Sequence, residues 1–549
     1  MKQHQYSSIN WLKILLTLII VIGIFIRFIN LDTKVYWTDE VATSLRIAGY
    51  TNKEAVEQIF NGSLITVAEL QKYQYPNAEK TFLDTIKSLA SSDVHPPLYF
   101  LTLRAWVQSF GDSITVTRSW SVVVSLLILP LLYWICVELF NSSLTGWIAL
   151  GLYSISPIQF SFAQQARYYT FWAVFILASG LALLRAIRTE RKWDWIIYSF
   201  TLILGLYTQI FHGLIILQNG IFMIINEKFS LNKSLIYYLL SVVFSMIFFL
   251  PWAIAMLIHK DEFVSQSSWI ANRVNLQEWL SIFIYNVVST FVNFWYSARY
   301  SPNILLSNLP WARFLIPSII LLIIYSFYIL IRYAPRQSST FLLSLIAVNV
   351  LFLSIPDFLS GGIRGLIERY LIPAYFGVEI AVAYTLANHI SIFPAKIWQK
   401  KLWQVILVIL LTAGLISCLA VSPAPGYFTY WPSKYPTSIS ISQEINRADK
   451  PLVLSYVNLT NAFTLGHLLT PKVTLQLNGD GKLDKVLDTK RFNSFFLYET
   501  VPGKADEFKK INENLPALEM NLLIDRNQQR LWKIDITPPM QKEFNKMGS

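Results

Sequence analysis

Residues 11–40 read WLKILLTLIIVIGIFIRFINLDTKVYWTDE and contain the first features that decide the fold. The run from Trp11 to Ile29 is apolar and long enough to cross a bilayer as a helix. No small-residue cleavage site follows it, so we expect a permanent span and not a removable signal peptide. The chain then turns polar and soon reaches the acidic pair Asp39-Glu40.

The composition of the chain indicates that much of it lies in lipid. Of its 549 residues, 54% are hydrophobic and only 14% are charged, whereas soluble domains have about 25% charged residues. Lys and Arg total 45 against 33 acids, but they flank apolar runs and form no single patch, which excludes a nucleic-acid partner. Cys136 and Cys418 both lie inside apolar runs, so neither indicates a disulfide or a metal site.

Hydropathy predicts an α-helical polytopic membrane protein with about eleven transmembrane helices, each of about 20 mostly apolar residues. The candidate spans cover residues 11–30, 118–138, 143–160, 168–187, 195–210, 212–226, 235–257, 311–332, 339–355, 369–388 and 402–421. The fifth and sixth are short, which predicts a tight hairpin.

Basic residues determine the predicted orientation in the membrane. They gather in connections that all fall on one side, near residues 185–192, 228–233, 332–336 and 396–401. Basic connections face the cytoplasm, so we expect a cytoplasmic N-terminus and an outward C-terminus. The overall form is typical of a bacterial plasma (inner) membrane protein, whose outer side is the periplasm.

Three predicted outward segments are too long to be simple connections, namely 31–117, 258–310 and 422–549. The first outer loop has amphipathic stretches that predict juxtamembrane helices, at 39–49, 53–60 and 78–90. We interpret residues 95–110 of this loop as a helix in the outer interface. After residue 422 short apolar runs alternate with helix-like stretches, which predicts a small α/β domain. The predicted domains are a transmembrane domain over 1–421 and an extracytoplasmic domain over 422–549.

Two acidic elements in the first outer loop are candidates for chemistry. Asp39 and Glu40 follow Thr38, which could cap a helix, and two acids in a first helical turn also suit the helix dipole. Asp93 and His95 lie in SSDVHPPLYF, where the Pro pair is equally compatible with a simple helix start. Because acids at the mouth of a helix bundle are costly unless paired or used, the two elements together indicate an acid/base or metal site.

Several predicted outward arginines are candidates for binding phosphate. Arg118 begins the second span, Arg167 and Tyr168 lie in FAQQARYYTFW, and Arg364 and Arg369 lie in GGIRGLIERYLIP. Each could be an interfacial anchor, because Arg, Tyr and Trp are enriched at membrane surfaces. As a set they favour phosphate binding, since the guanidinium offers a planar fork of donors that stays charged.

In the order of these motifs, the sequence resembles the GT-C class of membrane glycosyltransferases. The closest resemblance is to glycosyltransferase family 39, the protein O-mannosyltransferase and aminoarabinose transferase group. The marks are Asp39-Glu40, DVHPPLYF at 93–100, Arg118 and the QARYY stretch at 165–169. The resemblance covers residues 11–230 by motif and 231–421 only by hydropathy.

The resemblance implies an inverting sugar transfer from a polyprenyl phosphate or diphosphate donor to an acceptor hydroxyl at the outer face. Asp39 would be the general base, with Glu40 beside it. Asp93 and His95 would orient the loop, bind donor or hold a divalent metal ion. The lipid phosphate would be bound by residues of the arginine motifs, namely Arg118, Arg167, Tyr168, Arg364 and Arg369. The acceptor, which could be a protein, a lipid or a glycan, stays open.

Two other classes of protein fit the same composition. A transporter or lipid flippase would also have many spans, but it usually places polar residues near the midplane and repeats its halves. We interpret Gln209 and His212, the main polar residues deeper in the bundle, as interhelical hydrogen-bonding groups. The second alternative is a non-catalytic scaffold for glycan export, in which the C-terminal domain would be the working part.

Overall fold

The computed structural model describes residues 2–92, 95–261, 264, 268–293, 312–393, 396–426, 435–478, 491–500, 503–511 and 518–536. The chain divides into two compact units. The helical unit comprises Met1–Leu31, Asp93–Tyr99 and Arg118–Ala424. The α/β unit comprises Asp32–Ser92, Phe100–Thr117 and Pro425–Ser549.

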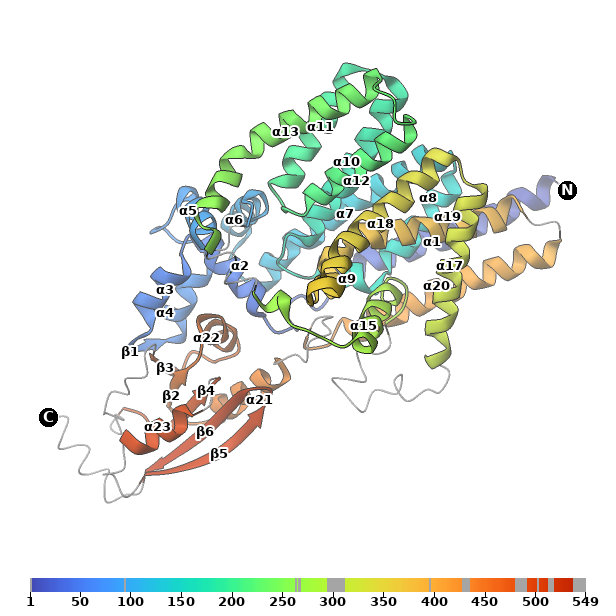
Figure 1. Cartoon of the computed structure of the whole chain (residues 1–549). Coiled ribbons are helices and arrows are strands. Elements are labelled where there is room, and N and C mark those ends of the chain that lie inside the picture. The colour runs from blue at the N-terminus through green and yellow to red at the C-terminus, as the bar shows by residue number, and fades with distance from the viewer. Residues whose placement is uncertain are drawn as a thin grey trace. The chain divides into compact units, whose positions relative to one another are not determined.

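Long apolar helices make up the helical unit, drawn in Figure 1. They are α1 (Lys2–Arg27), α7 (Ile114–Phe140), α8 (Ser143–Ser154), α9 (Pro157–Ala163), α10 (Tyr169–Thr189), α11 (Lys192–Leu206), α12 (His212–Asn226), α13 (Lys233–Ile258), α15 (Leu276–Val288), α17 (Ala312–Tyr333), α18 (Arg336–Ser360), α19 (Ile372–Ser391) and α20 (Ile397–Val421). A helix lies at each predicted span. Seven helices in the described residues are long and apolar enough to cross a membrane, so the fold is that of a polytopic membrane protein. The predicted number of eleven spans is not confirmed.

Helix α19 forms the centre of this unit, because it packs against α8, α17, α18 and α20. Nearly all of its residues are buried, in keeping with a sequence that is apolar on every side. By contrast, α13 keeps large apolar side chains such as Ile247 and Leu250 exposed. An apolar exposed face of this kind suits a helix that contacts lipid.

The span predicted over residues 143–160 is broken into two helices, which corrects the prediction of one continuous helix. Helix α8 ends at Ser154, and α9 starts at Pro157. Proline is well accommodated at the first position of a helix because it lacks the N–H that would otherwise be unpaired there. The end of α8 leaves carbonyls without helical partners, and Arg27 Nη2 donates to the Tyr153 oxygen at 2.9 Å.

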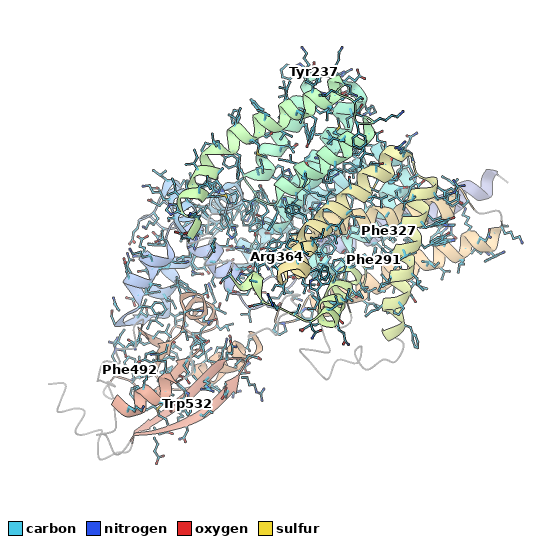
Figure 2. The ribbon with its side chains drawn as sticks, in the orientation of Figure 1. Tyr237, Phe291, Phe327, Arg364, Phe492 and Trp532 are labelled. Carbon is cyan, nitrogen blue, oxygen red and sulfur yellow. The ribbon has the colours of Figure 1, made fainter. Side chains whose placement is uncertain are left out.

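A six-stranded sheet in the order β1-β3-β2-β4-β6-β5 is the centre of the α/β unit (Figure 1). Its strands are β1 (Asn61–Thr66), β2 (Pro451–Tyr456), β3 (Thr474–Asn478), β4 (Ser494–Glu499), β5 (Leu518–Arg526) and β6 (Gln529–Ile536). Strands β3, β2 and β4 are parallel, and every residue of β2 is buried, as expected for the middle of a parallel sheet. Phe492 and Trp532, labelled in Figure 2, belong to the apolar core of this unit.

Strand β1 comes from the predicted first outer loop and pairs antiparallel with β3 of the C-terminal segment. The short apolar runs of the C-terminal segment include residues 452–457, 473–477, 494–498 and 530–536, which correspond to β2, β3, β4 and β6. The sequence predicted neither β1 nor β5. The three amphipathic stretches of the loop are helical as predicted, in α2 (Thr38–Ala48), α3 (Asn52–Ile59) and α5 (Phe82–Ser92). The remaining helices are α4 (Val67–Gln71), α6 (Leu98–Phe110), α21 (Tyr435–Arg447), α22 (Leu459–Gly466) and α23 (Lys504–Ile511). Helix α6 has 13 residues, too few to cross a membrane.

Candidate active site

The two acids at the start of α2 have different surroundings. Glu40 is fully buried, and its carboxylate accepts a hydrogen bond from the Trp37 backbone N–H at 3.5 Å. Asp39 is half-buried. Helix α2 begins at Thr38 with Trp37 in the cap position, so Thr38 does not cap the helix as expected. Glu40 therefore stabilises the helix start, and Asp39 is the more exposed acid of the pair.

The segment before Asp39 is held in place by contacts inside the α/β unit. The Val35 N–H donates to the Pro425 oxygen at 3.0 Å. The Tyr36 hydroxyl and the Ser44 Oγ are 2.6 Å apart, which ties the segment to the second turn of α2. These bonds fix the direction in which the chain enters the helix that carries both acids.

Buried Arg104 of α6 stabilises the other end of α2. Its guanidinium donates to the Ile47 oxygen at 2.6 Å and to the Thr85 Oγ1 at 3.0 Å. A cation at a helix C-terminus interacts favourably with the helix dipole and with carbonyls that lack helical partners. The acidic pair thus sits on a helix whose two ends are both held.

In the helical unit, the two motifs that follow the acidic pair in sequence meet. The ring centroids of His95 and Tyr168 are 5.5 Å apart, and those of Tyr99 and Tyr168 are 6.5 Å apart. The Arg167 guanidinium lies over the Tyr168 ring at 4.9 Å and over the Tyr169 ring at 5.7 Å. We call His95, Tyr99, Arg167 and Tyr168 the His–Arg cluster. Asp93, predicted to act beside His95, lies outside the described residues.

Arg118 on α7 is fully buried and bonds to the residue at which the first predicted outer loop begins. Its Nη1 donates to the Leu31 oxygen at 2.5 Å. One turn further along α7, the Ser121 Oγ donates to the Arg167 oxygen at 3.4 Å and lies 3.2 Å from the Tyr99 hydroxyl. Helix α7 therefore carries Arg118 and also contacts the His–Arg cluster directly, through Ser121.

Arg364 and Arg369 lie in the turn that connects α18 with α19, where Figure 2 labels Arg364. Arg364 Nη1 is 3.2 Å from the Asp357 carboxylate, which is fully buried and also accepts from the Arg364 and Gly365 N–H groups. Arg369 lies over the Trp269 ring at 5.6 Å and the Tyr370 ring at 5.4 Å. An acidic partner offsets the charge of Arg364, so it is a weaker phosphate candidate than the sequence indicated.

Two buried charges in the predicted spans were not singled out by sequence reasoning. Arg27 of α1 is fully buried and lies 4.5 Å from the centre of the Tyr153 ring. Glu379 of α19 is also fully buried, next to Ser156 and Gln159 and within electrostatic reach of Arg27. The sequence signal that could have found them is a charged residue inside a predicted span, because such residues are rare in membranes and are generally paired.

Metal ligands are the remaining part of the expected site. Among the described residues, no group of three His, Cys, Asp or Glu side chains is arranged to hold a metal ion. His95, one of the two predicted ligands, is half-buried and packed on an aromatic ring. The α/β unit offers a half-buried acid at Asp39, and the helical unit, taken by itself, offers an arginine stacked on tyrosine rings at Arg167.

Comparison with known proteins identifies the fold. Residues 94–254 match the family described as dolichyl-phosphate-mannose-protein mannosyltransferase. The crystal structure of ArnT from Cupriavidus metallidurans, bound to undecaprenyl phosphate, is similar over 96% of this chain and 98% of that one, with a TM-score of 0.51 and 12% identity. The chain has the GT-C glycosyltransferase fold. This confirms the resemblance that the motifs indicated.

A second crystal structure of the same relative gives the same fold assignment. ArnT from Cupriavidus metallidurans in the apo state matches with a TM-score of 0.51 and 13% identity, over 96% of this chain and 98% of that one. No curated protein matches the sequence. The matched family segment includes His95, Arg118, Arg167 and Tyr168 but starts after Asp39. The GT-C fold is thus supported over nearly the whole chain, and the family match covers the His–Arg cluster.

Proposed function

We propose that this protein is a membrane-embedded glycosyltransferase that moves a sugar from a polyprenyl phosphate or diphosphate lipid to an acceptor hydroxyl. The observation that carries the proposal is the difference between the two acids of α2. Glu40 is buried against the Trp37 N–H, while Asp39 beside it is half-buried. A reachable carboxylate at the start of a rigid helix suits a general base, and the GT-C fold gives the chemistry that this base would serve.

The proposed reaction is one displacement at the anomeric carbon, with inversion. The Asp39 carboxylate accepts the proton of the acceptor hydroxyl as its oxygen bonds to the anomeric carbon. The bond between that carbon and the phosphate oxygen breaks, and its electron pair stays on the lipid phosphate. A carboxylate also offsets the positive charge that develops on the sugar ring.

The leaving phosphate needs a counter-charge, and Arg167 is our first candidate. Its guanidinium lies over the Tyr168 and Tyr169 rings, which orients a planar fork of donors. Arg118 and Arg369 are further candidates, whereas the Asp357 carboxylate makes Arg364 a weaker one. Asp93 and His95 would orient the donor or hold a divalent ion that shares the counter-charge role.

The proposed setting is the outer face of a plasma (inner) membrane, with a cytoplasmic N-terminus. Asp39 and the C-terminal segment would then face the periplasm, which follows from the basic connections of the sequence. The acceptor would be a protein, a lipid or a glycan on that side. The undecaprenyl phosphate seen in the ArnT structure supports a lipid carrier of this chemical class.

Release of the sugar-free lipid is the test, as polyprenyl phosphate or polyprenyl diphosphate according to the donor, because this product is the same whatever the sugar and the acceptor. The protein would be purified, mixed with an extract of source membranes that supplies both the lipid-linked sugars and the acceptor, and assayed by mass spectrometry of the lipid fraction. We expect Asp39→Asn to lower release by about 10²- to 10⁴-fold, the range for loss of a general base. Binding of undecaprenyl phosphate itself should not change.

Asp32→Asn is the matched control, because Asp32 is an exposed acid in the same segment. Unchanged release by Asp39→Asn would refute the proposed base. A transporter or flippase would move the lipid-linked sugar across the membrane and release no polyprenyl phosphate, in wild type or variant. The same assay therefore separates the transferase from the main alternative class.

A further inference from the structure

The C-terminal segment packs directly onto the part of the chain that carries the acidic pair. Helix α22 contacts both α2 and α4. The Gln71 side chain donates to the Gly466 oxygen at 3.3 Å, and the Gln476 side chain donates to the Gly62 oxygen at 2.8 Å. Together with the pairing of β1 and β3, these contacts make α2 and α22 neighbours within one folded unit.

His467, the residue directly after α22, contacts the segment that leads into the acidic pair. Its ring centroid is 4.7 Å from that of Tyr36, in an edge-to-face arrangement, and 6.2 Å from that of Tyr75. Its Nε2 lies 3.3 Å from the Oε1 of Gln74, which is fully buried. His467 is thereby fixed in both position and ring orientation.

Tyr36 transmits this contact to the acidic pair. Its ring meets His467 while its hydroxyl bonds to Ser44 of α2. Only Trp37 and Thr38 separate it from Asp39 in the sequence. A shift of Tyr36 would therefore change the direction in which the chain enters α2, and with it the place of the Asp39 carboxylate.

We infer that His467 is a positioning residue for Asp39, acting through Tyr36, so that the C-terminal α/β segment completes the catalytic unit. This inference rests on the proposed function of Asp39. It gives α22 and the strand after it a role that the sequence motifs of the first loop do not reveal. The predicted signature is a loss of turnover without loss of donor affinity, because none of the contacts of His467 described here involves Arg167 or Tyr168.

The test compares His467→Ala, His467→Phe and wild type in the polyprenyl phosphate release assay. Misplacing a reacting group by about 1 Å can cost about 10²-fold in rate, so we expect His467→Ala to lower kcat by about 10- to 100-fold. The donor KM should stay within about twofold of wild type, because the phosphate-binding residues are untouched. His467→Phe keeps the ring against Tyr36 and should recover part of the lost kcat.

Phe508→Leu is the control for general destabilisation. Phe508 lies in the core that α23 forms with the same sheet, away from the contact between His467 and Tyr36. All variants are compared at equal folded fraction, measured by size-exclusion chromatography. If His467→Ala folds poorly, Tyr36→Phe tests the next step of the same link, because it removes the hydroxyl that bonds to Ser44 and keeps the ring; it should lower kcat in the same way.

The outcomes separate the inference from the function on which it rests. If Asp39→Asn is inactive while His467→Ala and Tyr36→Phe match Phe508→Leu in kcat, the inference is wrong and the proposed function stands. If Asp39→Asn keeps wild-type turnover, both are wrong. A rise in donor KM with unchanged kcat for His467→Ala would also overturn the positioning role.

Discussion

The ring of His95 and the ring of Tyr168 lie 5.5 Å apart between centroids. One belongs to the Pro-pair motif before α6 and the other to the Arg-Tyr-Tyr motif before α10. The fold thus brings two motifs into contact, whereas the sequence shows only their order along the chain. Their meeting point also carries Arg167, whose guanidinium stacks on the same tyrosine.

Replacing Arg167 by lysine should weaken donor binding. Lysine keeps the charge, but it loses the planar fork and much of the stacking on Tyr168 and Tyr169. Hydrogen bonds to charged groups contribute about 1.5–3 kcal/mol, so loss of one bond of the fork to the phosphate should raise the donor KM by roughly 10- to 150-fold. KM would be measured by release of polyprenyl phosphate, with exposed Arg273→Lys as the control. An unchanged KM would remove Arg167 from the phosphate site.

Replacing Glu40 by glutamine should affect stability more than turnover. Glutamine can still accept from the Trp37 N–H, but it lacks the negative charge that suits a helix N-terminus. The expected loss is about 0.5–1 kcal/mol in the free energy of unfolding, read as a lower melting temperature. Turnover at a temperature where the variant is folded should stay within about tenfold of wild type. A loss as large as that of Asp39→Asn would instead make Glu40 a catalytic residue.

Acidification should loosen α4 and α5 at their first turns. The Glu69 carboxylate accepts from the backbone N–H and hydroxyl of Thr66, and Asp84 accepts in the same way from Thr81. Backbone and hydroxyl hydrogen bonds from Thr66 hold the pKa of Glu69 below its usual value, and those from Thr81 do the same for Asp84. A depressed folded-state pKa contributes stability above the unfolded-state value of about 4 and loses it as the pH falls further.

Hydrogen exchange at a series of pH values measures this loosening. After correction for the intrinsic exchange rate, protection at the starts of α4 and α5 should fall as the pH drops below about 4. Glu69→Gln should remove the pH dependence at α4 and leave it at α5, so each helix serves as the control for the other. Equal pH dependence at α4 in wild type and Glu69→Gln would contradict the assignment.

Most of the helical unit could be predicted because its signal is local. A run of about 20 apolar residues needs no partner elsewhere in the chain to be recognised. The break between α8 and α9 was missed because the apolar run continues through it. The residue that satisfies the carbonyl at the end of α8 is Arg27, which belongs to a different span.

The α/β unit was predicted less completely because its decisive contacts are distant in sequence. Strand β1 is short, has four of its six residues exposed, and is defined by its pairing with β3. The surroundings of the site residues were equally hidden. The charge of Arg364 appears available in the sequence, yet it is offset by Asp357 of the preceding helix. Asp39 and Glu40 look equivalent until the burial of Glu40 distinguishes them.

The pairing of β1 with β3 imposes an order on biosynthesis. The Gln476 side chain that donates to Gly62 lies 414 positions later in the chain, and closing so long a loop is slow compared with local folding. The ribosome must therefore deliver every helix of the membrane bundle before the sheet beside Asp39 can be completed. A nascent or truncated chain that lacks β3 would hold its acidic pair on an unfinished support, so this unit is completed only after the whole membrane bundle has been synthesised.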